Sequence, residues 1–321
     1  MVFCCVLLFF VLLPSFSQAA EPPPAETLPP MVVTATRTEV PLNQLTTSLT
    51  VITAEDIRER QAELVSEVLR DVAGVNVIQT GSMGTATSVF IRGSASNQVL
   101  VLVDGVEINS TTTGAYDFAN LTTESVERIE VLRGAGGTLY GSQAVGGVIN
   151  IITKRGQGPL DVGVSAQGGN GWTNRQVATL RGGLGKLGYA FSVGHIGSQG
   201  FRSVNDDYRN LSTSARLDYQ LTENASLKGI FHYINSDAGL FNNNNFASTP
   251  DPNARQDTTQ YVGKLEWEQK ILANWDYRIS GSIFKEHDKF TDDVDSCVFF
   301  GFPCDPQRTR DIFRPQIASG E

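Results

Sequence analysis

The sequence predicts a chain of two parts, an α+β domain followed by the first strands of an antiparallel transmembrane β-barrel. Residues 40–156 mix a segment of helical periodicity with short β-rich runs, which is typical of an α+β domain. Residues 157–321 contain longer runs in which apolar and polar residues alternate, as they do in strands that cross a bilayer. The connections between these runs are alternately short and long, as expected for turns on one side of a membrane and loops on the other.

Residues 1–19 are predicted to be a secretory signal peptide. Val2–Leu13 is an unbroken apolar run, and it is too short for a membrane-spanning helix, which needs about 20 residues. Ser17 and Ala19 supply the small residues that precede a cleavage site. No Lys or Arg precedes the apolar run, so we expect the start at Met1 to lie inside a longer n-region. An N-terminal membrane anchor is the alternative interpretation.

Residues 20–39 form a Pro-rich and acidic leader that cannot build a core of its own. Within this leader, residues 31–37 read Met-Val-Val-Thr-Ala-Thr-Arg and follow two prolines. A short β-branched segment of this kind is disordered alone but can add as a strand to an exposed sheet edge. The alternative is a plain linker that contains a few β-forming residues.

Residues 40–156 are predicted to fold as one compact domain. A capping-box-like start at Thr53–Asp56 precedes apolar residues at helical spacing up to Val72, and Gly74 ends this helix. Val99–Val103 is apolar on both faces, so we expect it to lie in the middle of the domain.

Residues 157–321 are predicted to supply about seven strands and the start of an eighth. Tyr189, Phe191 and Val193, for example, alternate with small or polar residues. A soluble β-sandwich also alternates, but its strands average nearer 5–6 residues. An eight-stranded barrel has an interior only wide enough for its own side chains, so it cannot enclose the preceding domain. We therefore expect the chain to be a truncated, front portion of a larger barrel.

Composition and motif content argue against two classes of function. Lys and Arg number 25 and Asp and Glu number 34, so the formal net charge is −9, which disfavours a nucleic-acid partner. His195, His232 and His287 are far apart and lack HExxH spacing, and no Ser lies in a GxSxG motif. We predict neither an enzyme nor a covalent cofactor.

Two cysteines, Cys297 and Cys304, remain after removal of the signal peptide. They lie close together in a loop-like stretch of an exported chain, and exported proteins form disulfides readily. A disulfide that closes this loop is the favoured interpretation. A metal site is the weaker alternative, because neither a His nor a further Cys accompanies them.

Five motifs, taken together, indicate a family. They are Met31–Arg37, Ser88–Gly93, Val99–Gly105, Arg128–Gly134 and Tyr140–Thr153. In order and spacing, these segments resemble the TonB box and plug domain of TonB-dependent outer-membrane receptors. Within that family the chain is most similar to the cobalamin (vitamin B12) transporters.

The resemblance implies a barrel of 22 strands that is closed by a plug domain, here residues 40–156, in the cell outer membrane and in contact with its lipid. It implies import of a scarce, large ligand, cobalamin or another corrinoid, driven through the TonB protein. A ferric-siderophore or other metal-chelate receptor is the alternative within the family. A porin-like or adhesin barrel belongs to a different class and would need neither the box nor the plug.

The resemblance also assigns roles to single residues. Arg92 and Arg133 match arginines that hold the plug to glutamates of the barrel. Ala86, Ser88 and Ala95 match positions that contact the ligand, although the two alanines replace larger residues of the cobalamin transporters. The predicted TonB box, which would pair with TonB in an extended form, comprises Met31, Val32, Val33, Thr34, Ala35, Thr36 and Arg37.

A calcium site is predicted in the external loops. Cobalamin transporters order such loops with Ca²⁺, and Asp206, Asp207 and Asp257 fall near the matching positions. Carboxylate oxygens that converge from neighbouring loops are ligands that Ca²⁺ prefers. The alternative is that these aspartates are ordinary turn residues.

Overall fold

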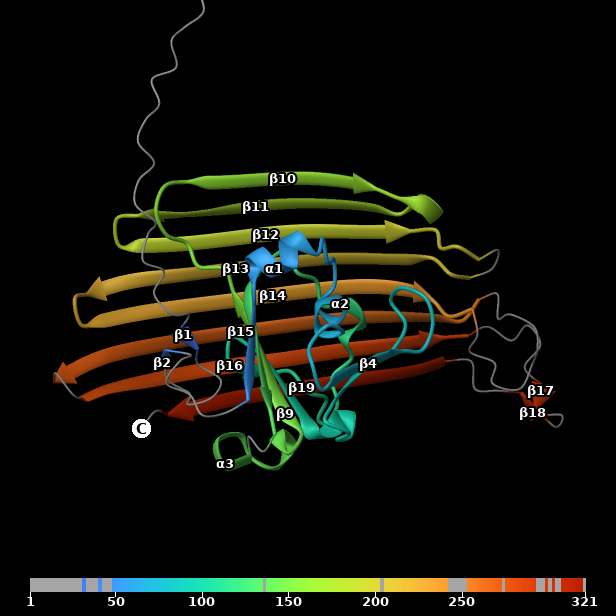
Figure 1. Cartoon of the computed structure of the whole chain (residues 1–321), viewed down its shortest axis with the longest axis horizontal. Helices are drawn as coiled ribbons and strands as arrows, with labels where there is room; N and C mark the ends of the chain where they lie inside the picture. The colour runs from blue at the N-terminus through green and yellow to red at the C-terminus, as the bar shows by residue number, and fades with distance from the viewer. Residues whose placement is uncertain are drawn as a thin grey trace, which may run out of the picture.

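The fold consists of a mixed α+β domain and one large antiparallel sheet (Figure 1). The computed structural model describes residues 31–32, 40–41, 48–134, 137–202, 205–241, 253–272, 275–292, 298–299, 302–303 and 307–319. Within these residues, no helix combines the length and the apolar character that a membrane-spanning helix needs.

A five-stranded sheet forms the centre of the α+β domain, with the strand order β3-β8-β9-β6-β7. Its strands are β3 Leu49–Thr53, β6 Val99–Val103, β7 Val106–Glu107, β8 Val126–Arg133 and β9 Gly147–Thr153. β6 and β9 run parallel to one another, and the other neighbours are antiparallel. Every residue of β6 is buried, as predicted for a strand inside the domain.

Short helices and a second, two-stranded sheet pack beside the central sheet. These elements are α1 Ala54–Glu59, α2 Val65–Leu69, β4 Val75–Gln79, β5 Thr87–Ile91, η2 Ser96–Gln98, η3 Phe118–Asn120, α3 Gly137–Tyr140 and η4 Ser142–Ala144. Val65 and Leu69 of α2 and Ile129 and Ile149 of the sheet are completely buried in one apolar cluster. The α+β domain therefore has a core of its own.

The predicted single helix between Thr53 and Gly74 is wrong in one respect, because the chain forms two short helices there. The capping box is present: the Thr53 hydroxyl accepts the N–H of Asp56, and the Asp56 carboxylate accepts the N–H of Thr53. After α1, however, Gln61 has a φ of 53°, which ends an α-helix. Leu64 then forms a β-bridge with Thr122, so tertiary contacts override the helical spacing.

The large sheet contains eight antiparallel strands in sequence order, which matches the seven to eight strands predicted. They are β10 Asp161–Gly168, β11 Asn174–Leu184, β12 Leu187–Ser198, β13 Tyr208–Thr222, β14 Ala225–Gly239, β15 Arg255–Leu272, β16 Trp275–Thr291 and β19 Gln307–Ser319. We call this sheet the wall. The turn η5 Asn170–Trp172 joins β10 to β11, and the strands β17 Val298–Phe299 and β18 Phe302–Pro303 lie between β16 and β19. Figure 1 shows tight turns at one end of the wall and the long connections at the other, with β17 and β18 on the long-connection side.

One face of the wall is apolar and exposed. Its exposed residues alternate along the strands with buried ones and include Phe191, Val193, Leu211, Leu217, Tyr219, Phe231, Tyr261, Leu265, Trp267, Ile279 and Ile283. Aromatic pairs lie at two levels of this face, Tyr233 with Tyr261 and Trp267 with Tyr277. The two levels are separated by roughly 20 Å along β15 at about 3.3 Å per residue. A lipid-facing band between aromatic girdles has this character.

The other face of the wall covers the α+β domain, which lies in front of the wall in Figure 1. Val262 of β15 and Phe284 of β16 are buried in the same apolar cluster as Val103, Val106 and Ile108 of the domain. The wall therefore completes the core of the domain on this side.

Several predicted segments lie outside the described residues. These are the signal peptide, the leader up to residue 30, Val33 to Arg37 of the predicted TonB box, and both Cys297 and Cys304. The start of the box is described: β1 Met31–Val32 pairs antiparallel with β2 Val40–Pro41, and Val32 is completely buried.

Candidate functional site

The turn between β6 and β7 is the main polar contact between the α+β domain and the wall. Asp104 and Gly105 form this turn, both with positive φ, 50° and 80°. Asp-Gly supplies such a turn easily, because aspartate tolerates the left-handed region and glycine favours it. The turn aims the Asp104 carboxylate at the wall, and the side chain is 5% exposed.

Asp104 binds groups from both parts of the chain. Its carboxylate accepts hydrogen bonds from the Thr153 amide (3.1 Å) and hydroxyl (2.6 Å). Arg216 of β13 lies 3.3 Å away and His232 of β14 lies 3.6 Å away. The Asp104 carbonyl accepts a hydrogen bond from Lys264 of β15 at 3.0 Å. One turn is thus held by three consecutive strands of the wall.

The charges at this contact are complementary. Burial alone would raise the pKa of the Asp104 carboxyl, but the His232 ring and the Arg216 guanidinium hold it well below its usual range. Arg216 is also placed by its hydrogen bonds to the carboxylate of Asp218 and to the carbonyl of Thr153. We call Asp104, Thr153, Arg216, His232 and Lys264 the turn latch.

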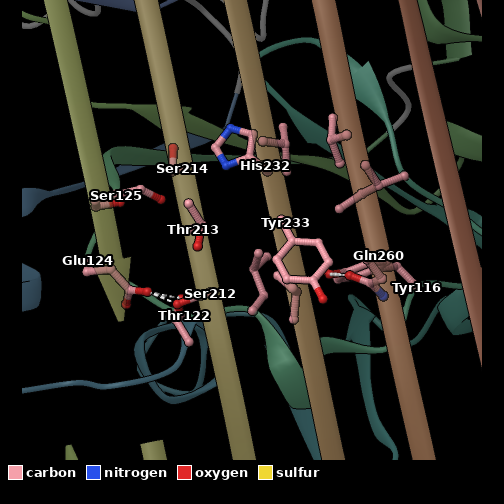
Figure 2. Close-up of a pocket in the computed structure, with 16 residues that line it drawn as sticks. Tyr116, Thr122, Glu124, Ser125, Ser212, Thr213, Ser214, His232, Tyr233 and Gln260 are labelled. Carbon is pink, nitrogen blue, oxygen red and sulfur yellow. Dashed lines mark hydrogen bonds between the residues drawn. The ribbon is translucent and has the colours of Figure 1, made fainter. Parts of the chain in front are cut away.

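A second polar contact is centred on Glu124, which precedes β8. Its carboxylate accepts hydrogen bonds from the hydroxyls of Thr122 and Ser212 (Figure 2) and lies 3.6 Å from the Arg175 guanidinium. The Lys154 ammonium donates to the Glu124 carbonyl at 2.8 Å. A Cβ atom on Gly194 of β12 would lie 2.4 Å from the Glu124 carboxylate, so a larger residue at position 194 would displace this carboxylate.

A third contact joins Tyr116 to β15 and β16. The Tyr116 hydroxyl donates to the Gln260 side-chain oxygen at 3.1 Å, and the Gln260 amide donates to Glu286 at 2.6 Å. Burial raises the pKa of Tyr116 well above its usual value. Next to it, burial raises the pKa of Asp117 to about 6, and the nearby Asp288 carboxylate adds to this shift.

A cavity of about 30 Å³ lies between these three contacts. Figure 2 shows that side chains of the domain, such as Tyr116 and Glu124, meet side chains of the wall, such as Ser214 and His232, around it. It has room for only a water molecule or two. It is therefore a small gap in a hydrogen-bonded interface and not a ligand site.

The three predicted ligand-contact residues are not brought together. Ala86 is exposed in the loop before β5, and Ser88 is half-buried inside β5. Ala95 is exposed beyond the other end of β5, at the start of η2. The five residues of β5 span about 16 Å. Ala86 and Ser88 therefore share one end of the strand, while Ala95 lies near the other.

Arg92 and Arg133 lie side by side on the α+β domain. A Cβ atom on Gly74 would lie 3.7 Å from Arg92 Cγ and 3.9 Å from Arg133 Cδ. Arg92 donates to the Ser48 hydroxyl at 3.1 Å, and Arg133 donates to the carbonyl of Ala73 at 2.6 Å. Their predicted binding to barrel glutamates stays a prediction.

The predicted calcium ligands have other partners. The Asp207 carboxylate accepts two hydrogen bonds of 2.9 Å from Arg255, which lower its pKa. One Asp206 oxygen accepts the amides of Phe201 and Arg202, while its other oxygen is buried without a hydrogen-bond partner among the described residues. Asp257 is paired in register with Asp237, which also binds Arg255.

The fit of these residues to calcium is therefore mixed. Across the described part of the chain, no group of three or more His, Cys, Asp or Glu side chains lies close enough to hold a metal ion. The unpartnered Asp206 oxygen is a suitable ligand for Ca²⁺, because Ca²⁺ prefers hard oxygen donors. Arg255 competes with the ion for the oxygens of Asp207.

The residues of the turn latch were not identified from the sequence. Asp104 lies in an Asp-Gly pair, which turn formation explains by itself. Arg216, His232 and Lys264 alternate with the lipid-facing residues of their strands. The alternation of polar and apolar residues was therefore the available sequence signal, and it predicted only that these side chains face inward.

The comparisons with known proteins agree with the fold. A family model described as the TonB-dependent receptor plug domain matches residues 41–148. The vitamin B12 transporter BtuB of Vibrio cholerae is 35% identical over 296 residues, which cover 85% of this chain and 47% of the transporter. BtuB of Vibrio vulnificus is 51% identical over 123 residues, which cover 38% of this chain and 20% of the transporter. The chain thus spans less than half the length of these relatives.

Among solved structures, the siderophore receptor PirA of Acinetobacter baumannii is similar, with a TM-score of 0.63 and 22% identity. The match covers 82% of this chain and 43% of PirA. At this identity the likeness concerns the fold alone: an α+β plug domain followed by antiparallel barrel strands.

Proposed function

The chain belongs to the TonB-dependent receptor family, and on this premise we propose that it acts in an outer-membrane receptor that imports cobalamin or a related corrinoid with energy from TonB. The choice of ligand rests on the 35% identity to a vitamin B12 transporter over 85% of the chain. Residues 40–156 are the plug, and the wall is the part of the barrel that holds it. The apolar outer face of the wall contacts outer-membrane lipid, and residues 1–19 direct export.

The plug–wall interface supports a transport role. Its three contacts are polar and include the buried Asp104–Arg216 pair. Hydrogen bonds of this kind can be exchanged for hydrogen bonds to water, which offsets part of the cost of moving the plug, while the apolar packing of Val262 and Phe284 holds the plug at rest. The interface therefore suits a plug that is stable at rest and moves under force.

The TonB box supplies the point at which the force acts. The described start of the box already adopts an extended form, because β1 pairs with β2. TonB would bind the box by strand addition, in which backbone groups provide the grip. Since β2 occupies the edge of β1, TonB competes with this hairpin for the same backbone groups.

The remaining site assignments are part of the proposal. Ala86, Ser88 and Ala95 contact the ligand, and Arg92 and Arg133 bind barrel glutamates. Calcium, where bound, would be held by oxygens of Asp206, Asp207 and Asp257 and would neutralise their charge. Cys297 and Cys304 form a disulfide that closes an external loop.

A ferric-siderophore receptor is the second candidate. One specific observation favours it: two of the three positions matched to ligand contacts are alanines, which offer a cobalamin few contacts. PirA, a siderophore receptor, shares the fold, but its low identity carries no argument about the ligand.

Uptake by cells tests the two candidates. The receptor is produced from its gene in cells that lack their own cobalamin receptor, and energy-dependent uptake of radiolabelled cyanocobalamin is measured. Saturable uptake that stops when TonB is absent supports the proposal. Specific uptake of a ferric siderophore, with no uptake of cyanocobalamin, would replace it with the second candidate.

A further inference from the structure

The loop between β4 and β5 approaches the wall closely at Gly84, next to Met83, which packs against a cluster that contains Tyr208 and Ala238. Gly84 has a φ of 82°, a conformation that favours glycine. A Cβ atom there would lie 2.3 Å from the ring of Tyr208 and 2.9 Å from Cβ of Ala238. Both the backbone conformation and the space therefore require glycine at this position.

Tyr208, the first residue of β13, cannot move aside easily. Its side chain is completely buried. Its hydroxyl donates to the Asn120 side chain at 3.1 Å, and the Asn210 amide donates to this hydroxyl at 2.9 Å and to the Asn120 carbonyl at 3.0 Å. Leu64 and Ile196 pack in the same apolar cluster. The ring thus presents a fixed surface to Gly84.

Two long connections of the wall, from β12 to β13 and from β14 to β15, begin or end next to Tyr208. Asp207, which precedes Tyr208, accepts the N–H of Gly239 at 2.9 Å through its carbonyl. Asn205 donates from its side chain to the Ala254 carbonyl at 2.8 Å, and Leu240 donates its N–H to the same carbonyl at 2.8 Å. These residues, 205–207, 239–240 and 254, are called the loop bases.

We propose that the contact between Gly84 and Tyr208, which we call the joint, couples the plug loop (residues 80–86, between β4 and β5) to the loop bases. The plug loop carries Ala86 and precedes Ser88, so this inference deepens the proposed function: the joint positions the ligand-contacting loop relative to the external loops. Because coupling is reciprocal, ordering of either side stabilises the other. Gly84 and Tyr208 are positioning residues in this scheme.

A glycine elsewhere in the plug offers a matched control. Gly141 has the same φ of 82°, but no described atom lies within 4 Å of the position of its Cβ. Gly84→Ala and Gly141→Ala both place an alanine at a φ of 82°, and only Gly84→Ala introduces the clash with Tyr208. The difference between the two variants isolates the joint.

Hydrogen–deuterium exchange of the receptor in outer-membrane vesicles tests the coupling without any ligand. Gly84→Ala should speed exchange about tenfold, the effect of roughly 1.4 kcal/mol, in residues 80–86 and also in the loop bases. Gly141→Ala should leave both regions unchanged. Faster exchange confined to residues 80–86, or equal changes in both variants, would overturn the proposal.

Two further variants keep the test decisive if Gly84→Ala fails to assemble. Tyr208→Phe removes the hydroxyl bonds but keeps the ring, and it should loosen both the loop bases and the plug loop. In a double-mutant cycle, Tyr208→Ala removes the nearer obstacle and leaves only Cβ of Ala238, so Gly84→Ala should have a smaller effect in the Tyr208→Ala background than in the unaltered receptor. Full additivity of the two effects would contradict a direct contact.

Binding of cyanocobalamin provides a functional readout. Cyanocobalamin should dissociate faster from the Gly84→Ala receptor than from the Gly141→Ala receptor, because the plug loop is no longer held in place. If the unaltered receptor does not bind cyanocobalamin, the proposed function fails, while the exchange experiment still decides whether the joint exists.

Discussion

The carboxylate of Asp104 lies 3.3 Å from the guanidinium of Arg216, although 112 residues separate them in the sequence. Both side chains are almost completely buried between the plug and the wall. This pair links a turn of the plug to β13, the fourth strand of the wall. Its contribution can be measured against an exposed pair in the same chain.

Asp104→Asn should weaken the attachment of the plug. Asparagine keeps the turn, since it tolerates positive φ, but it leaves Arg216 buried without its full partner, and breaking a buried pair costs about 3 kcal/mol. Urea unfolding of the plug in the detergent-solubilised receptor measures the loss. Asp161→Asn is the control, because Asp161 and Arg181 form a surface pair, and its effect should stay below about 1 kcal/mol. Equal effects of the two variants would refute a special role of the turn latch.

Part of this picture could be predicted from the sequence. The capping box at Thr53, the buried strand Val99–Val103 and the long alternating strands all depend on local residue patterns, and all three are present. The break between α1 and α2 could not be predicted, because it depends on the bridge between Leu64 and Thr122. Contacts across many residues leave no periodic signal in the chain.

The same reasoning explains what was missed at the interface. The sequence predicts a turn at Asp104 and an inward-facing charge at Arg216, which is one of several such charges. Neither pattern indicates that these two residues pair with each other. The arginines proposed from the family resemblance, Arg92 and Arg133, lie together on the plug but have partners only within it in the described residues. The residue pattern was enough to predict the fold, but only the structure shows which residues pair across the interface.

The pKa of Asp117 predicts that the plug loses stability as the pH rises. Burial raises this pKa from 3.8 to about 6 in the folded protein, so between these values the native state binds more protons than the unfolded state. Stability should therefore fall as the pH rises from about 4 to 6 and stay level above that range, by about 1.4 kcal/mol per unit of pKa shift. Asp117→Asn should remove this slope. Urea midpoints at several pH values measure it, and an identical slope in both proteins would assign the effect to another group.

A proline substitution in the predicted TonB box tests its role in energy coupling. Val33→Pro removes one backbone donor and fixes φ, so strand addition by TonB should fail and uptake should be abolished. Binding of cyanocobalamin to the same cells should be unchanged, because the substitution affects strand addition by TonB and leaves the proposed ligand-contact residues Ala86, Ser88 and Ala95 in place. Val33→Ala keeps the backbone donor and should retain uptake. Normal uptake by the proline variant would remove residues 31–37 from the coupling mechanism.

Calcium should order the external loops before the ligand arrives. Ligand affinity should fall when calcium is chelated, because the ion neutralises neighbouring carboxylates and stabilises only the ordered state. Asp207→Asn combined with Asp257→Asn should mimic chelation. Arg255 now occupies the Asp207 oxygens, so Arg255→Gln should tighten calcium binding measured by calorimetry with CaCl₂ alone. Equal ligand affinity with calcium and with excess chelator would return these residues to the class of ordinary loop aspartates.

The plug should fold in isolation, but with lower stability than in the receptor. Val65, Leu69, Ile129 and Ile149 are completely buried in a cluster whose members, apart from Val262 and Phe284, come from the plug, so residues 40–156 supply most of this core. Two kinds of contact are lost without the wall: the apolar packing of Val262 and Phe284, and the Arg216 partner of Asp104.

Circular dichroism of the purified segment 40–156 in urea measures this stability. We expect one cooperative transition at a lower urea midpoint than that of the plug in the receptor. In the isolated segment Asp104→Asn should cost little, because the carboxylate no longer faces a buried guanidinium and is solvated instead. The same variant should cost about 3 kcal/mol in the receptor. This difference separates the contribution of the wall from that of the turn, and an equal cost in both settings would show that Asp104 stabilises the plug by itself.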